Sequence, residues 1–573
     1  MKTNRLVRGV FLILALALGI FFGYRQILPP AAPSEIKEDV IGFSEAGEGP
    51  DLNLLISHIK QMASQVHSVD SEGIRVTQAY LEQQLTEMGY AVQKESYQLT
   101  MDEVLALQKE RADFRGAVFD ETEAGNRDYS GIGDKPTMNL TNIITRVDAP
   151  DTNDTIIFVA HTDSVKMGPG AFDDIVSVSA LLEGMRQVTR LTPARDLVFL
   201  FSDGEEQGLL GAAKFVKDHP ELRDVTRLVI NVEARGNKGA VLMFETTPDN
   251  LGIVSEYNNA VTYPVSFSIA TAVYQTMQND TDLSSFMMAG YPGMNLAVID
   301  GAEVYHTAQD NVDTFDRASA RHYLDTVTEL VTHFATSPDL ELSSGQDAVH
   351  FPFFAGNLWV MPQNTANLLA YAAFALTLFL LVLMLLRHKI AAGTLLYSFL
   401  LQLLSFAAAG GLSFLVIKLV LRSYSVSSYR EILSLGFVQP LFYALLAGGA
   451  LISWVIFRML VKGSKSTDSA ALGVLILPAI LALATTFLFP SANYLFSLPV
   501  LAGAAVFILS LALRPGAALF HALGSFVFML LYVPVVILVY VALSFQSAHF
   551  AVVLSQIPLT MIWGLSALVH RKA

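Results

Sequence analysis

The sequence predicts an α/β domain with a mostly parallel mixed sheet flanked by helices, followed by a C-terminal all-α domain that crosses a membrane several times. Strand and helix patterns alternate over roughly residues 50–340, and apolar stretches of bilayer length recur from Asn367 onward. Charge separates the two parts. Residues 361–573 contain 11 of the 37 Lys and Arg residues but only 2 of the 52 Asp and Glu residues, so their net charge is near +9 and that of the first 360 residues near −24.

Composition limits the classes of function. A chain of 573 residues with 52% hydrophobic and 16% charged residues indicates a membrane protein. The acidic first part makes nucleic acid and an anionic lipid surface unexpected partners for that domain. Cysteine is absent, which excludes disulfides and thiolate metal ligands and leaves His and carboxylates for any zinc site.

The N-terminus carries an apolar segment, Val10 to Tyr24, with basic residues on both sides. A cleaved signal peptide and an uncleaved anchor both fit this pattern. The stretch is long for a signal peptide, and no clear cleavage site follows it directly, although Ala31-Ala32-Pro33 is a candidate. We therefore expect a membrane anchor over residues 1–28 and a linker over 29–48.

The α/β domain is expected over residues 49–345, with short apolar runs as strands and longer amphipathic patterns as helices. The expected helices are 51–66, 74–89, 178–189, 209–218 and 318–335, and the expected strands are 91–97, 142–147, 155–160, 196–201, 227–232, 240–245 and 294–299.

A multi-span membrane domain is expected over residues 360–573, with about seven helices. With the N-terminal anchor, this makes about eight membrane spans. Two of the expected helices are long or interrupted by Gly, so the number of spans could differ by one. The expected spans are 367–386, 394–417, 437–457, 470–489, 493–513, 518–544 and 549–569.

Orientation follows from the basic residues in the loops. With a cytoplasmic N-terminus, four basic loops or ends face the cytoplasm and one faces outward, so the α/β domain is expected outside the cytoplasm. A bacterial cell membrane fits a cysteine-free chain with short loops, and an internal eukaryotic membrane is the alternative. Since the spans contain almost no ionisable side chain, with His521 as one, an anchor or scaffold is favoured over a transporter. The cytoplasmic basic residues are Arg387, Lys389, Arg458, Lys462, Lys465, Arg514, Arg571 and Lys572, and the outward ones are Lys418, Arg422 and Arg430.

Acidic residues and histidines follow several of the expected strands. Ligands of open α/β sheets bind beyond the carboxyl ends of the strands, so these side chains should converge at one edge. Imidazole and carboxylate are what a pair of divalent cations needs, including one carboxylate that bridges them. Each motif alone is weak, but their order and placement at strand ends strengthen the prediction. The residues are His161, Asp163, Asp173, Glu205, Glu206, Glu233 and His306.

These motifs together resemble the co-catalytic two-zinc aminopeptidase family. Within it, the chain is similar to the membrane-bound branch that includes the endoplasmic reticulum metallopeptidase and the vacuolar membrane protease. The resemblance covers roughly 50–340 by motif and the rest by architecture. It implies a zinc exopeptidase-like fold, two Zn²⁺ per chain, a peptide substrate from which N-terminal residues are removed, and a lipid bilayer as environment.

The resemblance also implies a role for each site residue. His161 and Glu233 would hold the first zinc, Glu206 and His306 the second, and Asp173 would bridge them. Glu205 would be the general base for a hydroxide held between the ions, and Asp163 would orient His161.

The chain also departs from the family pattern. Asp173 is followed by Asp174-Ile175-Val176-Ser177 where the family commonly has Asn-x-Ser-Gly, which puts the packing of that helix start in question. Asp282 is interpreted as a helix N-cap, with a pocket residue as the alternative. The segment Asp310 to Asp313 is interpreted as a helix-capping loop without chemistry.

Alternative functions stay open. An inactive relative is disfavoured because all the ligands and the base are present. A cyclase is disfavoured because that branch works with one zinc and His161 is retained. A membrane receptor or scaffold that uses a peptidase-like domain to bind peptides is the rival from another class. Residue preference and oligomeric state are not predicted.

Overall fold

The computed structural model describes residues 2–31, 49–114, 116, 137–150, 152, 154–275, 277, 279–354, 356–426, 431–432, 435–463 and 466–570. Most of the expected linker, residues 32–48, lies outside this range, as do Arg430, Lys465, Arg571 and Lys572. The chain divides into two compact units. One comprises Leu28–Asp347 and Gly356–Val360, and the other comprises Met1–Ile27, Ala348–Ala355 and Met361–Ala573.

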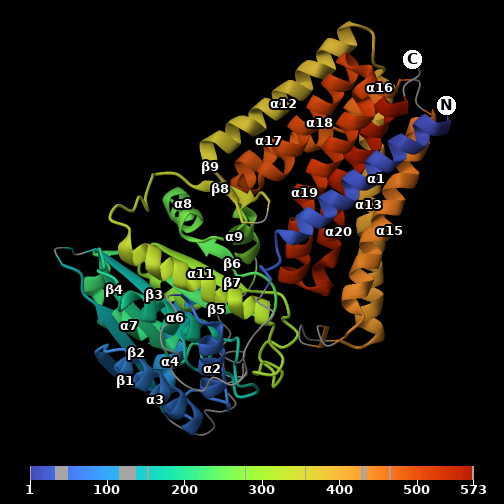
Figure 1. The fold of residues 1–573 in the computed structure, drawn as a ribbon. Helices are drawn as coiled ribbons and strands as arrows, with labels where there is room; N and C mark the ends of the chain where they lie inside the picture. Colours follow the sequence, from blue (N-terminus) through green and yellow to red (C-terminus); the bar gives the residue numbers. More distant parts are fainter. Residues whose placement is uncertain are drawn as a thin grey trace. The chain divides into compact units, whose positions relative to one another are not determined.

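Seven strands in the described part of the first unit form one mixed sheet, in the order β1-β2-β4-β3-β5-β7-β6 (Figure 1). The central strands β4, β3, β5 and β7 are parallel, whereas β1, β2 and β6 are antiparallel to their neighbours. This confirms the predicted mostly parallel mixed sheet. The strands are β1 Val92–Thr100, β2 Thr137–Val147, β3 Thr155–His161, β4 Asp196–Ser202, β5 Thr226–Ala234, β6 Leu242–Thr246 and β7 Gly293–Val298.

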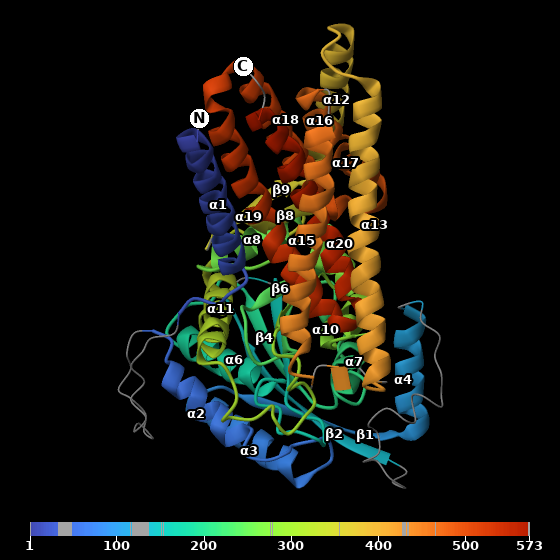
Figure 2. The same cartoon turned by 90° about the vertical axis from the view of Figure 1, so that its right-hand side faces the viewer.

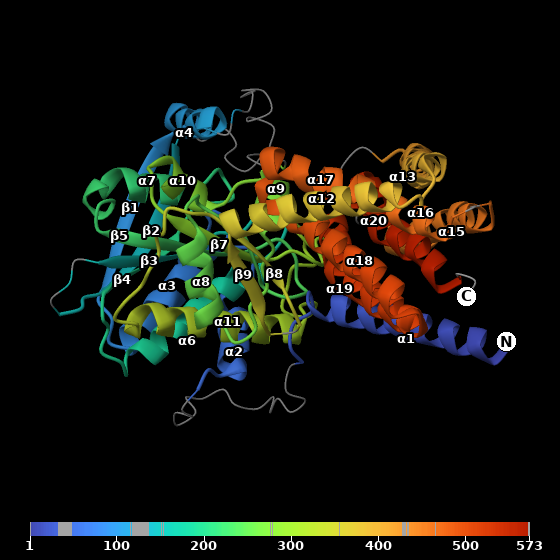
Figure 3. The same cartoon turned by 90° about the horizontal axis from the view of Figure 1, so that it is seen from above.

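Helices cover both faces of the sheet. Figure 3 shows α7 and α10 on one side of the strands and α6 and α11 on the other. Helix α2 packs against α6 and α11, and α4 packs against α7 and α10. The helices are α2 Leu52–Met62, α3 Glu72–Glu87, α4 Met101–Phe114, α6 Ile175–Val188, α7 Leu210–Asp218, α8 Leu251–Ala260, α9 Ser268–Tyr274, α10 Asp282–Met288 and α11 Arg317–Thr336. Of these, α4, α8 and α9 were not predicted from the sequence, and α10 was predicted only as the helix that Asp282 would cap.

Side-chain alternation along the central strands explains why the sheet is buried on both faces. Ile157 and Val159 of β3 lie in one core cluster with Phe215 of α7. Phe158, between them, stacks on Phe199 of β4 with ring centroids 5.2 Å apart. Because successive side chains of a strand point to opposite faces, a strand that is apolar at every position must be covered on both sides. This rigid, doubly covered sheet holds the strand ends on which the site is built.

The second unit is helical. Within the described residues, eight segments are long and apolar enough to cross a membrane, by length and composition (Figure 2). Its α16 and α17 together make one of these segments, Thr467–Leu488. The short strands β8 Ala348–Pro352 and β9 Leu358–Pro362 form a separate two-stranded sheet. The helices are α1 Lys2–Arg25, α12 Gln363–Leu386, α13 Ala392–Ser423, α15 Val438–Gly463, α16 Thr467–Gly473, α17 Ile476–Leu488, α18 Tyr494–Ala512, α19 Ala517–Leu543 and α20 Ala548–Leu565.

The N-terminal helix α1 packs closely along α19. A Cβ on Gly19 would lie 2.7 Å from Cβ of Met529, so the absence of a side chain there lets the two backbones approach. Pro534 in α19 has no amide hydrogen, which leaves the carbonyl of Leu530 without its helical donor. The side chain of Gln26, which is buried, donates from Nε2 to this carbonyl at 3.3 Å. The end of α1 thus satisfies a polar group that the proline exposes in α19.

This contact makes a testable prediction for a double-mutant cycle. Gln26→Leu should destabilise the protein by about 1 kcal/mol, because a buried carbonyl then loses its donor. In a Pro534→Ala background the helix supplies its own N–H, so the same substitution should cost much less. Thermal unfolding of the four proteins in detergent measures the difference. If Gln26→Leu lowers stability equally in both backgrounds, the hydrogen bond from Gln26 to the Leu530 carbonyl does not contribute to stability.

Candidate metal centre

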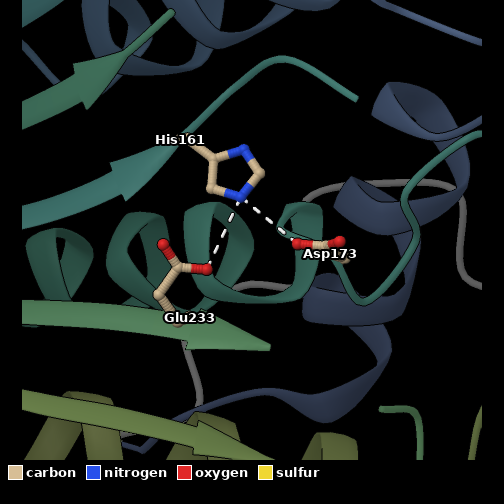
Figure 4. A group of neighbouring side chains, drawn as sticks. All are labelled: His161, Asp173 and Glu233. Carbon is tan, nitrogen blue, oxygen red and sulfur yellow. Dashed lines mark ion pairs between the residues drawn. The ribbon is translucent and has the colours of Figure 1, made fainter. Parts of the chain in front are cut away.

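His161 is the last residue of β3, at the carboxyl end of the sheet. Its Nδ1 lies 2.9 Å from the main-chain carbonyl oxygen of Asp163, so Nδ1–H donates there and Nε2 is the ring nitrogen left to face a proton or a cation. Nε2 lies 3.3 Å from Oδ1 of Asp173 and 3.6 Å from Oε2 of Glu233, at the end of β5 (Figure 4). These three side chains form the first donor group.

A second donor group shares Asp173 with the first. Nε2 of His306 lies 3.2 Å from Oδ2 of Asp173 and 3.0 Å from Oε2 of Glu206. The two oxygens of Asp173 therefore face different histidines, Oδ1 toward His161 and Oδ2 toward His306. The structure thus brings together the five residues proposed as ligands from the sequence, from five separate strand ends and loops.

The donor set fits divalent cations. In each group the possible ligand atoms lie within 4.8 Å of one another. Among the residues that the structure describes, no hydrogen-bond partner is found for Nε2 of His161 or Oε1 of Glu206, although both atoms are buried. Buried polar atoms normally have a partner, and imidazole with carboxylate is the donor chemistry that zinc accepts when thiolates are absent. A carboxylate with one oxygen toward each group is what two neighbouring cations require.

The electrostatics of the site call for positive charge. Burial raises the pKa of Glu206 to about 7, with the Asp173 carboxylate adding to the effect and His306 opposing it. Burial would lower the pKa of His306, but the carboxylates of Glu206 and Asp173 outweigh it and raise the pKa to about 10. Burial would also lower the pKa of His161, but the carboxylates of Glu233 and Asp173 outweigh it and raise the pKa well above its usual value. The site therefore binds extra protons when no cation is present, and a cation would replace them.

Glu205 and Glu206 lie on the turn after β4, and the carboxylate of Asp163 holds that turn. Its Oδ1 accepts the main-chain N–H of Glu205 at 3.0 Å, and its Oδ2 accepts that of Glu206 at 3.2 Å. The resemblance in the sequence implies that Asp163 orients His161. In the structure its Oδ1 lies 3.7 Å from Nδ1 of His161, and the carbonyl of Asp163 makes the closer contact. Asp163 thus contacts His161 through its carbonyl, and its carboxylate fixes the main chain of the two glutamates.

The side chain of Glu205 lies among carboxylates. Burial, followed by the negative charge of Glu233, raises the pKa of Glu205 well above its usual value. A carboxylate in such surroundings holds a proton more firmly than one in water, which suits a group that accepts a proton and later returns it.

Asp282 is placed differently from the sequence interpretation. Thr281 is the N-cap of α10, and Asp282 is its first helical residue. The Asp282 side chain is fully buried and accepts a hydrogen bond from the hydroxyl of Ser202, at the end of β4. The N-cap interpretation is therefore wrong, because the carboxylate points into the interior beside the strand ends instead of toward the N–H groups of its own helix.

Asp310 is the residue that sequence reasoning missed. The helix that follows is capped by Asp316, whose side chain accepts the N–H of Ser319, so the capping interpretation of the segment from Asp310 is wrong. The buried carboxylate of Asp310 accepts the main-chain N–H groups of Phe172 and Asp173. The sequence signal that could have identified Asp310 is its position four residues after His306, a proposed metal ligand.

The departure after Asp173 does not disturb the packing of α6. Ile175 and Val176 are fully buried at the helix start, and Ser177 is buried beside them. Asp174 accepts the main-chain N–H of His161 at 3.2 Å, which ties the helix start to the end of β3. The larger side chains therefore fill the position that small residues occupy in the family pattern.

The sheet, the strand-end location and the two histidine–carboxylate groups define an α/β domain with a candidate centre for two divalent cations. Residues 142–331 match the sequence profile of Peptidase family M28. Over 222 residues the chain is 32% identical to Endoplasmic reticulum metallopeptidase 1 of Homo sapiens, which covers 38% of this chain and 24% of the human protein. Over 205 residues it is 32% identical to the Vacuolar membrane protease of Candida albicans, and this match covers 35% of this chain and 24% of the Candida protein. These matches confirm the resemblance found in the sequence.

A longer sequence match and a match to a solved structure were also found. The chain is 26% identical over 387 residues to the Putative endoplasmic reticulum metallopeptidase 1 of Schizosaccharomyces pombe, covering 64% of this chain and 44% of that protein. The matched segment thus spans about a quarter to less than half of these relatives' length. Among solved structures, the aminopeptidase from Aneurinibacillus sp. strain AM-1 is 18% identical and covers 52% of this chain and 97% of that chain, with a TM-score of 0.40.

Proposed function

We propose that the chain is a membrane-bound zinc metallopeptidase that removes N-terminal residues from peptides. The observation that carries this proposal is the pair of donor groups that share Asp173 and lie beside Glu205. The proposed peptidase domain comprises residues 49–345, between an anchor over 1–28 with its linker over 29–48 and a membrane domain over 360–573.

Two zinc ions per chain are proposed. His161, Asp173 and Glu233 would hold the first ion, and Asp173, Glu206 and His306 the second. When bound, such ions lower the pKa of water and polarise the scissile carbonyl.

Glu205 is proposed as the general base and acid. Its carboxylate takes a proton from the attacking water as the water oxygen forms a bond to the carbonyl carbon. When the carbon–nitrogen bond breaks, Glu205 gives that proton to the leaving amine, so the base is regenerated. Asp163 supports this step by fixing the main chain of Glu205 and Glu206, and the pKa of Glu205, raised first by burial, favours proton uptake.

The partners and the membrane environment of the chain are also proposals. The partners are a peptide substrate and a lipid bilayer, without nucleic acid, and no oligomeric state is specified. Basic residues in the loops support an orientation with the peptidase domain outside the cytoplasm, in a bacterial cell membrane. The relatives named above are endoplasmic reticulum and vacuolar proteins, so an internal eukaryotic membrane is the alternative that fractionation of native cells would distinguish.

Matched peptide substrates test the exopeptidase proposal. The purified full chain, supplied with zinc, should hydrolyse aminoacyl fluorogenic substrates with a free N-terminus and leave the N-acetylated versions intact. Equal hydrolysis of both forms would contradict N-terminal selectivity. A protein that retains zinc and binds peptides but hydrolyses none of the panel would favour the receptor or scaffold.

A further inference from the structure

We propose that Asp310 is a positioning residue that fastens together the two loops carrying Asp173 and His306, and thereby builds the second metal site. The proposal rests on the proposed function, because it assumes that these donors hold zinc. It assigns a specific task to a segment that shows no chemistry in the sequence.

The contacts of Asp310 hold the main chain around Asp173. Its Oδ1 accepts the N–H of Phe172 at 2.9 Å, and its Oδ2 accepts the N–H of Asp173 at 3.1 Å. Its carbonyl oxygen accepts the N–H of Ala171 at 3.2 Å. The residue is only 3% exposed, so water does not compete for these charge-assisted hydrogen bonds. Three successive amides before and at the bridging carboxylate are thus fixed by one residue.

The same residue is fastened to the loop of His306. The N–H of Asp310 donates to the carbonyl oxygen of Thr307 at 3.1 Å. That carbonyl also lies against Gly168, where a Cβ would come within 2.1 Å of it. The two loops therefore pack main chain to main chain, and a shift of either one moves a donor relative to the other.

Asp163 makes the same kind of contact with another ligand-bearing turn of the site. Its carboxylate accepts two successive main-chain N–H groups, those of Glu205 and Glu206, as Asp310 does for Phe172 and Asp173. Each ligand-bearing turn is thus held by a buried carboxylate that is not itself in either donor group. Groups that orient metal ligands typically change metal affinity by about 10- to 100-fold when removed.

The two metal sites should respond unequally to loss of Asp310. His161 and Glu233 extend from strands β3 and β5, which the sheet holds independently of Asp310. Asp173 and His306, in contrast, both lie on loops that Asp310 joins. The second site loses the positioning of two of its donors, whereas the first site loses that of one.

The test compares zinc binding of the full chain with that of Asp310→Ala, Asp310→Asn and a control, Asp313→Ala. Asp313 is an exposed aspartate three residues further along the same loop. Zinc per chain is measured after equilibration with chelators of graded affinity. We expect Asp310→Ala to keep one zinc tightly and to bind the second about 10- to 100-fold more weakly. Asp310→Asn, which keeps one acceptor oxygen, should lie between it and the wild type, and Asp313→Ala should match the wild type.

The outcomes separate this proposal from the proposed function. Two zinc ions with unchanged affinity in Asp310→Ala would overturn the positioning role. Equal weakening of both sites together with a lower unfolding temperature of the metal-free protein would also overturn it, because that pattern is a general loss of stability. A wild-type protein that binds fewer than two zinc ions would instead overturn the two-zinc function on which the inference rests.

Discussion

Glu205→Gln is expected to lower kcat by about 100- to 10,000-fold while the zinc content stays the same. The amide has nearly the shape of the carboxylate but cannot accept the proton of the attacking water. Glu205 belongs to neither donor group, so its removal should not release metal. Steady-state kinetics with an aminoacyl fluorogenic substrate, together with metal analysis of the same preparation, measure both quantities.

The control for this variant is Glu303→Gln, which changes an exposed glutamate paired with Lys238 on the surface. It should leave kcat and zinc content unchanged. A Glu205→Gln protein with wild-type kcat would exclude Glu205 as the base. Loss of zinc in parallel with loss of activity would assign the residue to metal binding instead.

Asp173→Ala is expected to reduce turnover to a small residual rate and to weaken both zinc sites. Its two oxygens face the two histidines, so one substitution removes a donor from each group and leaves the two ions without a shared carboxylate. Metal content after dialysis and the rate of substrate hydrolysis measure the effect. We expect a larger loss of zinc than for any single change at His161 or His306, each of which belongs to one group only.

The double variant Asp173→Ala with Glu205→Gln gives a second test of the same account. Residues that act as one catalytic unit show non-additive effects, so the double variant should be no slower than Asp173→Ala alone. Losses of activity that multiply would contradict a single centre in which both side chains serve the same step.

The part of the site that was predictable from sequence lies at strand ends. The apolar runs before His161 and Glu233 mark β3 and β5, and the carboxyl ends of parallel strands meet at one edge of a sheet. Polar residues directly after such runs are therefore expected to be neighbours. His306 lies in a loop, and its assignment depended on resemblance to the family.

The contacts that support the site were not predictable in the same way. The hydrogen bonds that the Asp310 carboxylate accepts from the main-chain N–H groups of Phe172 and Asp173 join residues more than 130 positions apart. In the local sequence, an Asp four residues after His306 is equally typical of a capping residue. Asp282 was misinterpreted for the same reason, because its partner, the Ser202 hydroxyl, is supplied by tertiary packing. In the second unit, the Gln26 side chain donates a hydrogen bond to the carbonyl of Leu530, 504 residues away in the sequence.

Some helices were missed because their local signal is weak. Helix α4 buries only Val104 and Gln108, so its apolar periodicity is slight. Helix α9 has seven residues, too few to establish a helical period. The long apolar spans were easier to predict, because a bilayer imposes both length and composition on a crossing helix.

Metal content per chain tests the central claim most directly. Mass-spectrometric metal analysis of the purified full chain, after zinc loading and removal of free metal, should find two zinc ions per chain. A value of one or none, under conditions in which the chain hydrolyses peptides, would contradict a centre in which Asp173 joins two donor groups.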